Sequence, residues 1–441
     1  MSALSRRTFV NTTGLAGLAA AGVGSPFLRS VRAGEPGPNG KLRMGLIGCG
    51  GMGQGDLNCF LLNPEVEFAV ICDVDDARLA KGVAICEEKR GKKPDTVKDF
   101  RRVLDRKDID AVLIATPDHW HALPAVLACQ AGKDVYVEKP LAKTIDEGRA
   151  MLEAAKRHNR VVQMGSQWRS CQHIIEAAEM IRSGKLGKVS LARGWAFLDW
   201  LPSIGKPADC PPPAGVDYDL WLGPAPQRPF NPNRFHFNFR WFWDYAGGLM
   251  TDWGVHLINM IAMGLPAEAP KSVTSCGGKF ILDDDSETPD SQVTAFDFPS
   301  CQLIWEHRAG LNNGLNGRPW GVEWHGTEGN IILNDTGWDF VTEPKRAKTP
   351  SQRKHSSGGD PRVPHVRNFL DCVKSRQQPV LNLDVGHRVS TLAHLGNIAY
   401  RTGQKIVWDG ANEKIVGNPE ADRLVGAEYR KPWTLPYARR A

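Results

Sequence analysis

The chain has 441 residues, of which 41% are hydrophobic and 24% charged, an ordinary composition for a globular enzyme and a length that allows two domains with separate cores. The net charge of +6 falls to +2 without the four arginines of residues 1–33, a stretch that contains no acidic residue. A remainder so close to neutral excludes binding of nucleic acid or an anionic membrane surface through net charge alone.

Residues 5–33, SRRTFVNTTGLAGLAAAGVGSPFLRSVRA, have the three parts of an export signal. Paired Arg6 and Arg7 precede Phe9, an apolar stretch rich in alanine and glycine, and the small residue Ala33. This order resembles a twin-arginine signal, and the apolar stretch is too short to anchor the chain in a membrane. We expect residues 1–33 to direct export to the periplasm through the twin-arginine translocase; a basic tail without a targeting role is the alternative.

The ten cysteines are scattered singly, without a C-x-x-C pair or metal-type spacing. Cys49, Cys72 and Cys129 fall in segments that read as buried, so we expect inert core thiols. An exported protein can form disulfides, but the sequence predicts no particular pair.

From residue 41 onward, short apolar runs alternate with helical patterns. The runs at residues 42–48, 67–73, 110–116 and 134–137 are predicted strands. Between and after them, residues 54–63, 76–90, 123–132 and 148–159 are predicted helices, the last preceded by a capping box of Thr144 and Glu147. Strands this uniformly apolar, separated by helices, predict a parallel sheet covered on both faces.

The first turn of this sheet, GCGGMG, places Gly48, Gly50 and Gly53 in a G-x-G-x-x-G pattern. Glycines there permit a tight turn and bring backbone N–H groups, including those of Gly51 and Met52, close to a pyrophosphate. Asp73 follows at the tip of the second strand, where a carboxylate accepts ribose hydroxyls and repels a 2′-phosphate. The pattern therefore predicts a dinucleotide site that favours NAD over NADP; a glycine turn without a nucleotide is the alternative.

Two further strand ends should face the same crevice, since a parallel sheet binds its ligand beyond the carboxyl ends of its strands. They are ATPDHWH, residues 115–121, and VEKP, residues 137–140. His119 and His121 lack a third ligand at sensible spacing, so we favour a histidine that shapes the nicotinamide pocket over a metal pair. The residues expected to contact the cofactor from these two ends are Thr116, Pro117, His121 and Glu138.

The order GCGGMG, Asp73, A-T-P-x-x-x-H and E-K-P resembles the Gfo/Idh/MocA family, named after glucose–fructose oxidoreductase and inositol dehydrogenase. The second half agrees with the family, with GGLMTDWGVHLIN at residues 247–259, a late hairpin at GTEGNIIL and a closing helix at HVRNFLDCVKSRQQPV. The similarity extends over about residues 41–410.

This resemblance implies an α/β protein in which a Rossmann domain precedes a C-terminal α/β domain with a large, mostly antiparallel open sheet that often supports homo-oligomers. Residues 188–197, 271–282, 290–298 and 301–309 have the β-rich composition that such a sheet requires. The predicted parts of the chain are a linker at 34–40, the Rossmann domain at 41–165, a substrate domain at 166–410 and a C-terminal extension at 411–441. Within the substrate domain, residues 199–240 are rich in proline and aromatics and are predicted to form an irregular insertion near the site.

The resemblance also assigns catalytic roles. Lys139 of E-K-P would point at the reacting hydroxyl and lower the pKa of that hydroxyl. The peptide bond between Lys139 and Pro140 is often cis in relatives. Asp252 and His256 are four residues apart and are predicted to share one face of a helix that begins near Thr251. His256 would accept the proton, and Asp252 would orient the ring or contact a neighbouring hydroxyl. A helix cap and a core histidine are the alternative interpretation of this pair.

A sugar or cyclitol is the expected substrate, because sugars stack their C–H faces on flat rings while their hydroxyls bind polar groups. Aromatic residues are abundant in RFHFNFRWFWDY, residues 234–245, and at Trp168, Trp195, Trp200 and Trp253. The candidate substrate residues are Trp168, Arg169, Arg240, Tyr245 and Asn259. Relatives often carry aspartate where this chain has Asn259, so the substrate of the best-known members does not transfer.

An exported enzyme has no access to the cytoplasmic NAD pool, so we expect NAD to be folded in before export and retained. Three functions remain open at this point. The first is an NAD-dependent sugar or cyclitol oxidoreductase. The second is a redox-cycling glycoside hydrolase, lyase or epimerase that acts through a transient keto-sugar. The third is a sugar-binding protein without catalysis, against which the intact Lys139, Asp252 and His256 argue.

Overall fold

The computed structural model describes residues 40–346 and 349–439. The expected export signal and nearly all of the expected linker lie outside these ranges. In the part of the chain that is described, no helix is both long and apolar enough to cross a membrane.

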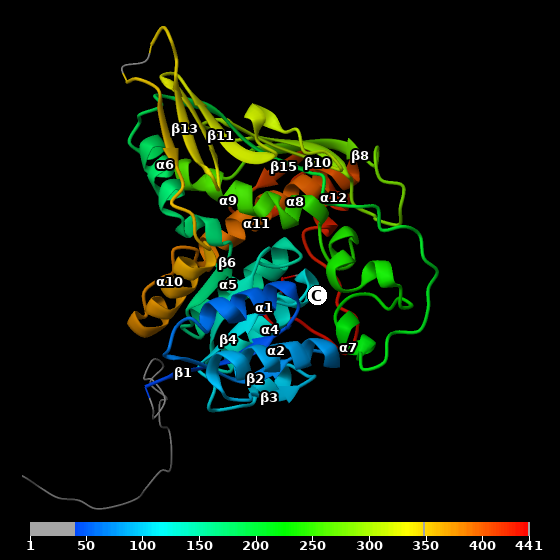
Figure 1. Cartoon of the computed structure of the whole chain (residues 1–441). Helices are drawn as coiled ribbons and strands as arrows, with labels where there is room; N and C mark the ends of the chain where they lie inside the picture. Colours follow the sequence, from blue (N-terminus) through cyan, green and yellow to red (C-terminus); the bar gives the residue numbers. More distant parts are fainter. Residues whose placement is uncertain (1–39, 347–348, 440–441) are drawn as a thin grey trace, which may run out of the picture. The chain divides into compact units, whose positions relative to one another are not determined.

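The first half forms a six-stranded parallel sheet in the order β3-β2-β1-β4-β5-β6 (Figure 1). Its strands are β1 Leu42–Ile47, β2 Val66–Cys72, β3 Asp95–Val97, β4 Ala111–Ile114, β5 Asp134–Glu138 and β6 Val162–Gly165. The helices between them are α1 Gly51–Phe60, α2 Asp76–Arg90, α3 Arg101–Leu104, α4 Ala122–Gln130 and α5 Ile145–Arg157. The doubly wound parallel sheet is the predicted fold, and the predicted capping box of α5 is present.

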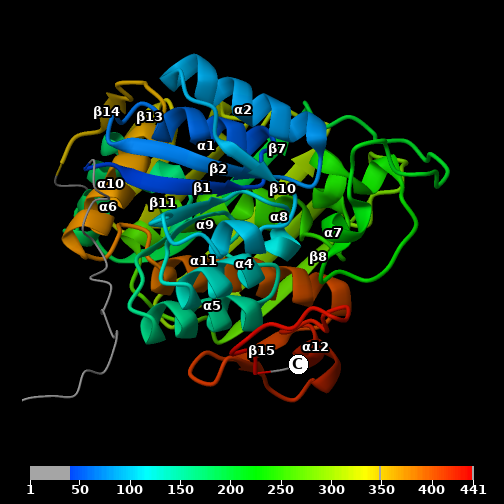
Figure 2. The ribbon, with the colours of Figure 1, turned by 90° about the horizontal axis from the view of Figure 1, so that it is seen from below.

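Both faces of this sheet are buried, as its uniformly apolar strands require. On one face Leu46 packs in a cluster with Phe60 of α1 and with Phe369 of the later helix α10, Arg362–Ser375. On the other face Val112 packs in a cluster with Met151 of α5. Figure 2 shows α1 and α2 on one side of the strands and α4 and α5 on the other.

The second half forms a ten-stranded sheet in the order β14-β13-β12-β11-β7-β10-β9-β8-β15-β16, in which β7 and β10 are the parallel pair and the other neighbours are antiparallel. Its strands are β7 Val189–Leu198, β8 Ser272–Gly278, β9 Ser291–Asp297, β10 Gln302–Ala309, β11 Trp320–Gly326, β12 Gly329–Asn334, β13 Gly337–Thr342, β14 Gln352–His355, β15 Ile406–Asp409 and β16 Lys414–Ile415. This mostly antiparallel sheet confirms the fold expected for the C-terminal domain.

Helices pack on one face of this sheet (Figure 1). They include α6 Gln172–Arg182, α8 Gly248–Asp252, α9 Gly254–Gly264 and α11 Leu383–Thr402. Gly194 of β7 faces α9, since a Cβ there would lie 3.4 Å from Leu257 and Ile261, an ordinary packing distance. The helix α5 of the Rossmann half packs against α11, and α11 also packs against α8 and α9 of the second half. The helix α11 therefore contacts the helices that cover each of the two sheets.

The structure corrects two predicted elements. The predicted strand at 271–282 ends at Gly278, because the Asp290 carboxylate accepts the N–H groups of Phe280, Ile281 and Leu282 and holds them in a loop. The predicted closing helix at 365–380 is α10, which ends at Ser375, and the chain continues into α11, for which no prediction was made.

Residues 199–245 form a largely irregular segment with one short α-helix, α7 Tyr218–Leu222, and two 3-10 helices, Pro232–Arg234 and His236–Trp241. The segment docks on the Rossmann half (Figure 1). Asp217 N–H donates to the Val74 carbonyl at 2.9 Å, and Asp76 N–H donates to the Gly215 carbonyl at 3.2 Å. His236 Nε2 lies 3.0 Å from the carboxylate of Asp75. This segment is therefore attached to the loop that follows β2.

The C-terminal residues return to the Rossmann half after α12, Pro419–Arg423. Arg430 donates its backbone N–H to the Pro224 carbonyl and its Nε to the Gly223 carbonyl, both at 2.9 Å. Trp433 packs edge-on against Trp120, with ring centroids 4.9 Å apart. The C-terminal segment thus joins the irregular segment to the loop after β4.

Candidate active site

The glycine turn between β1 and α1 has the geometry of a phosphate-binding loop. Gly48 has φ +89°, and a Cβ there would lie 2.7 Å from backbone atoms of Ala115 and Thr116. A Cβ at Gly53 would meet the Gly48 carbonyl oxygen at 2.2 Å, whereas Gly50 and Gly51 face open space. Since the first N–H groups of a helix have no partner within the helix, the turn offers free donors beside space for a pyrophosphate.

Asp73 lies at the tip of β2, where the sequence places the ribose contact. Its Oδ2 accepts the N–H of Cys49 at 2.7 Å, and its Oδ1 accepts the N–H of Asp75 at 3.0 Å. Each oxygen keeps a second lone pair for a hydroxyl. Burial raises the pKa of this carboxyl above its ordinary value, against the lowering effect of the two backbone donors.

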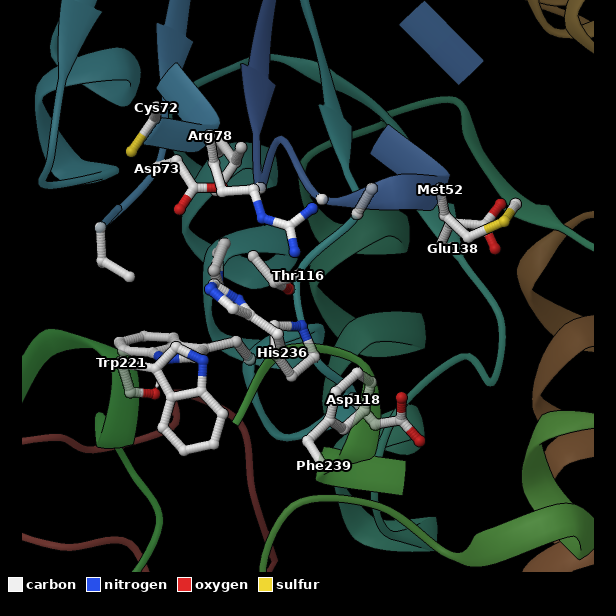
Figure 3. Close-up of a pocket in the computed structure, with 18 of the residues that line it drawn as sticks. Met52, Cys72, Asp73, Arg78, Thr116, Asp118, Glu138, Trp221, His236 and Phe239 are labelled. Atoms are coloured by element: carbon white, nitrogen blue, oxygen red, sulfur yellow. Dashed lines mark hydrogen bonds between the residues drawn. The ribbon is translucent and has the colours of Figure 1, made fainter. Parts of the chain in front are cut away.

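A cavity of about 390 Å³ begins at this turn and extends to the end of β5. Its Rossmann wall includes the glycine turn, Asp73, Thr116, Pro117 and Glu138, and the irregular segment closes it with Trp221, His236, Phe237, Phe239 and Arg240. Figure 3 shows Trp221 and Phe239 across the cavity from Asp73 and Arg78. Most of the residues predicted to contact a dinucleotide therefore surround one space; Gly53 and His121 do not line it.

Lys139 lines the wall of this cavity, and the peptide bond that joins it to Pro140 is cis. Its Nζ donates to Asp252 Oδ1 at 2.5 Å and to the Asp252 carbonyl at 3.1 Å. Arg240 Nε donates to the same Oδ1 at 3.1 Å. Burial raises the pKa of the Asp252 carboxyl, but the charges of Lys139 and Arg240 outweigh burial, so this pKa lies well below its ordinary value. Asp252 is thus an ionised partner that holds two cations at the cavity wall.

His256 lies behind this pair. The prediction that Asp252 and His256 share one helix is wrong: α8 ends at Asp252, Trp253 intervenes with ψ −40° and φ −97°, and α9 begins at Gly254. Burial and the Lys139 charge lower the pKa of His256 to about 3, so its ring is neutral at pH 7. Its Nδ1 lies 2.9 Å from Ser166 Oγ. The charge of Lys139 lowers the pKa of the imidazole and the charge of Asp252 raises it. The imidazole does not line the cavity itself.

Several predicted residues lie elsewhere. His121 lies behind the cavity, with Nδ1 2.7 Å from the Pro140 carbonyl and Nε2 2.9 Å from the Thr116 carbonyl, so it connects two loops of the site. His119 Nε2 faces a different group, the Trp221 carbonyl, at 3.0 Å. Tyr245 is fully buried against His119 and Trp221 and is a core residue. The expected substrate contact of Tyr245 is therefore not available in this structure.

The predicted tryptophan cluster divides into three. Trp168 stacks on Trp320 of β11 with centroids 4.5 Å apart and also contacts the His256 ring at 4.9 Å. Trp253 joins this group at 5.9 Å from Trp168. Trp195 is fully buried in the second sheet, and Trp200 is 48% exposed beside Phe237. Only Trp168 and Trp253 lie close to the predicted catalytic residues.

Arg169 and Asn259, both predicted to contact substrate, contact each other. Arg169 Nη1 donates to Asn259 Oδ1 at 2.8 Å, and Asn259 Nδ2 donates to Ser166 Oγ at 3.2 Å. Both residues are therefore occupied behind His256.

The sequence did not single out Asp118 and Arg78, which line the cavity. Burial raises the pKa of Asp118 to about 7, against the lowering charge of Lys139. Asp118 lies inside ATPDHWH, at a strand end that was already expected to face the crevice, and this position could have identified it as a site residue. Arg78 points into the cavity (Figure 3) and forms no ion pair with the described residues. Its position in the first turn of α2 offered no comparable signal.

All ten cysteines fall within the described ranges and are free thiols. Cys49, Cys72 and Cys129 are buried, as predicted, and burial raises the pKa of each thiol.

Two family models match the chain. The model "Oxidoreductase family, NAD-binding Rossmann fold" of the Gfo/Idh/MocA group matches residues 42–166. The model "Oxidoreductase family, C-terminal alpha/beta domain" of the same group matches residues 179–276 and 344–435. Together the two models match more than two thirds of the chain.

Curated relatives match over part of their length. Levoglucosan dehydrogenase of Pseudarthrobacter phenanthrenivorans is 38% identical over 109 residues, which are 25% of this chain and 28% of that protein. The alpha-N-acetylgalactosaminidase of Shewanella oneidensis is 30% identical over 152 residues, which are 34% of this chain and 33% of that enzyme. The matched region thus spans about a third of the length of these relatives.

Solved structures share the fold over most of the chain. Levoglucosan dehydrogenase in complex with NADH and levoglucosan has a TM-score of 0.65 and 21% identity, covering 83% of this chain and 99% of its own. Aldose-aldose oxidoreductase from Caulobacter crescentus, complexed with glycerol, has a TM-score of 0.63 and 20% identity, with coverage of 83% and 99%. Because both family models match and the two-sheet fold agrees with them, this chain belongs to the Gfo/Idh/MocA family of NAD-binding oxidoreductases.

Proposed function

We propose that this protein oxidises a secondary hydroxyl of a sugar or cyclitol, with NAD favoured over NADP as the hydride acceptor. The observation that carries the proposal is the Lys139–Asp252 pair, because it places an ammonium group at 2.5 Å from its carboxylate in the wall of the dinucleotide cavity. A strand-end lysine without a role would be solvated, whereas the Lys139 side chain is only 8% exposed.

Each group of this cluster has a part in the chemistry. The Lys139 ammonium holds the substrate oxygen and lowers the pKa of the hydroxyl. Asp252 and Arg240 fix the position of that ammonium. Oxidation transfers the carbinol hydrogen as hydride to NAD, when bound, and the hydroxyl proton to a base. This base is either the neutral ring of His256, where its lone pair faces the substrate, or water in the cavity.

NAD preference is supported by the geometry at Asp73, whose two oxygens each keep one lone pair toward the cavity. A 2′-phosphate would bring negative charge beside this carboxylate. Arg78 is the opposing influence, since its unpaired guanidinium lies in the same cavity.

Retention of the cofactor is part of the proposal. The irregular segment covers the cavity and docks at Val74 and Asp75, and the C-terminal segment attaches it again through Arg430 and Trp433. A dinucleotide enclosed on both sides leaves only when this cover opens, so exchange with free NAD is expected to be slow. Such retention suits an enzyme exported already folded, as the twin-arginine pattern of residues 1–33 predicts.

A second candidate function uses the same site. Oxidation to a transient keto-sugar would activate a neighbouring C–H bond and permit elimination of a glycosidic substituent. The hydride held by the site would then be returned to the same molecule, with no net oxidation. The match of 152 residues to an alpha-N-acetylgalactosaminidase favours this redox-cycling hydrolase, lyase or epimerase.

One experiment separates the two candidates. Nucleotide released on denaturation is identified by mass spectrometry, and the native protein is offered a panel of sugars and cyclitols while reduced nicotinamide absorbance is followed. In parallel, nitrophenyl glycosides are supplied without added NAD. Accumulation of reduced cofactor with a polyol supports the oxidoreductase, and release of nitrophenol without net reduction supports the cycling enzyme. Protein free of nucleotide that turns over added NAD freely would contradict the proposed retention.

A homo-oligomer completes the proposal. The face of the ten-stranded sheet opposite α9 carries half-buried apolar side chains such as Ile304 and Ile332 beside the paired charges of Arg193, Glu306 and Glu323. Sedimentation analysis of the purified protein tests whether this face is covered by a second copy.

A further inference from the structure

Four side chains behind the catalytic cluster form one chain of hydrogen bonds. Arg169 Nη1 contacts Asn259 Oδ1 at 2.8 Å, Asn259 Nδ2 contacts Ser166 Oγ at 3.2 Å, and Ser166 Oγ contacts His256 Nδ1 at 2.9 Å. Ser166 and Asn259 have no exposed surface. The polar side-chain atoms of Ser166 and Asn259 must therefore find their partners within the protein.

The direction of every bond in the chain follows from the chemistry of its first member. An arginine guanidinium has only donors, so the Asn259 atom that faces Arg169 is the acceptor oxygen. The amide nitrogen of Asn259 then faces Ser166 and donates to its oxygen. The Ser166 hydroxyl proton needs an acceptor of its own, and among the described residues the acceptor it contacts is His256 Nδ1.

His256 Nδ1 is consequently an acceptor, and a neutral imidazole with an unprotonated Nδ1 carries its proton on Nε2. The ring is neutral at pH 7, because burial and the nearby Lys139 hold its pKa at about 3, against the opposing charge of Asp252. His365 is the other titratable group whose charge acts on it. Nε2 makes no hydrogen bond with residues 40–346 or 349–439, so it is the nitrogen left for a ligand.

We propose that Asn259 is a positioning residue that keeps His256 as a hydrogen-bond donor through Nε2–H, rather than as the proton acceptor that the family pattern implies. This inference rests on the proposed oxidation. The Nε2–H group would donate to the substrate oxygen beside the Lys139 ammonium, and the hydroxyl proton would pass to water in the cavity as the carbinol hydride passes to NAD. The products would be the ketone, NADH and a proton released to water. Protonating Nδ1 instead would leave the buried Ser166 hydroxyl proton without an acceptor.

The substitution Asn259→Asp should reverse this arrangement. A carboxylate at this position has only acceptor oxygens, so one oxygen pairs with Arg169 and another accepts the Ser166 hydroxyl proton. Ser166 Oγ is then free to accept a proton from His256 Nδ1–H, and Nε2 presents its lone pair. A single amide-to-carboxylate change would thus turn His256 from a donor into a base.

The tautomer can be measured without substrate. In protein labelled with nitrogen-15 histidine at pH 7, the signal of His256 is assigned by its loss in His256→Gln. We expect a pyridine-type Nδ1 and a pyrrole-type Nε2 in the unsubstituted protein, and the reverse in Asn259→Asp. A pyrrole-type Nδ1 in the unsubstituted protein overturns the inference whatever the variants do. Asn334→Asp is the matched control: it changes a buried asparagine of β12 whose Oδ1 already accepts the Thr336 N–H, so the His256 tautomer should not move.

Kinetics provides the second measurement. Glutamine keeps an N–H donor but cannot act as a base, so His256→Gln should lower kcat by no more than about tenfold in the natural background. In the Asn259→Asp background the same change should cost about 10²-fold or more, the usual contribution of a general base. Equal losses of 10²-fold or more in both backgrounds overturn the inference. A protein that shows the expected tautomer but oxidises no polyol would contradict the proposed function and leave the tautomer assignment intact.

Discussion

The substitution Lys139→Met tests the role of the ammonium group in the catalytic cluster most directly. Methionine keeps most of the length and apolar contact of the lysine stem but removes the ammonium. The loss leaves Asp252 with one cation, Arg240, at 3.1 Å. We expect the pKa of the Asp252 carboxyl to rise, because the cation that opposes burial most strongly has gone.

The size of the effect follows from burial. The Lys139 and Asp252 side chains are 8% and 13% exposed, so solvent screens the pair only weakly. Removing one partner of a buried ion pair typically costs about 3–5 kcal/mol. Since Arg240 still pairs with Asp252, we expect the loss to be about 2 kcal/mol, which is one charge-assisted hydrogen bond. The loss of catalysis should be larger in proportion, on the order of 10²–10⁴-fold in kcat.

Urea unfolding and single-turnover reduction of the bound cofactor measure these two effects separately. Adding Asp252→Asn to Lys139→Met should not restore stability, because Arg240 then loses its carboxylate partner, and it should not restore hydride transfer. Lys374→Met, which removes a lysine that is 49% exposed from its pair with Glu65, should cost at most about 1 kcal/mol and no activity. Full turnover by Lys139→Met, or a double variant as stable as the unsubstituted protein, would refute this reasoning.

Three further predictions concern the cofactor half. Asp73→Ala should raise the affinity for NADP relative to NAD, since Arg78 then faces a 2′-phosphate without an opposing carboxylate; titration of nucleotide-depleted protein with both cofactors tests this, and an unchanged ratio would contradict it. Trp433→Ala should remove the edge contact with Trp120, weaken the cover over the cavity and speed the loss of bound nucleotide during dialysis, whereas unaltered retention would show that the C-terminal segment has no part in it. Burial raises the pKa of the Glu138 carboxyl, so the native state binds a proton that the unfolded state releases above about pH 4.3. The free energy of unfolding should therefore fall as pH rises from about 4.3 toward the native pKa of Glu138. Urea unfolding at several pH values should show a smaller fall in Glu138→Gln, by on the order of 1 kcal/mol over this pH range. The same fall in the variant would count against the assignment.

Much of the Rossmann half could be predicted because its signals are local. Apolar runs marked the strands, the spacing of residues 76–90 gave α2 with the bounds the structure shows, and Thr144 with Glu147 marked the start of α5. The glycine turn and Asp73 were predictable for the same reason, since a short motif between a strand and a helix fixes their relative positions.

The parts that escaped prediction depend on contacts between distant residues. The break between α8 and α9 at Trp253 interrupts a pattern that reads as one helix. The helix α11 is buried almost all round between α5 and the second sheet, so it lacks an amphipathic pattern even though Asn382 caps its start and Gly403 its end. Asn259 looked like a substrate contact by its type, and only its contacts with Arg169 and Ser166 show it to be occupied inside the protein.

The central claim is that Lys139, Asp252 and His256 meet at the pyridine ring of a dinucleotide held in the cavity beside the glycine turn. A crystal structure of the purified protein with its nucleotide measures this directly. We predict the pyridine ring within contact distance of the Lys139 ammonium, with the imidazole of His256 on the same side. A pyridine ring bound away from Lys139, with the imidazole separated from it by other side chains, would contradict the claim.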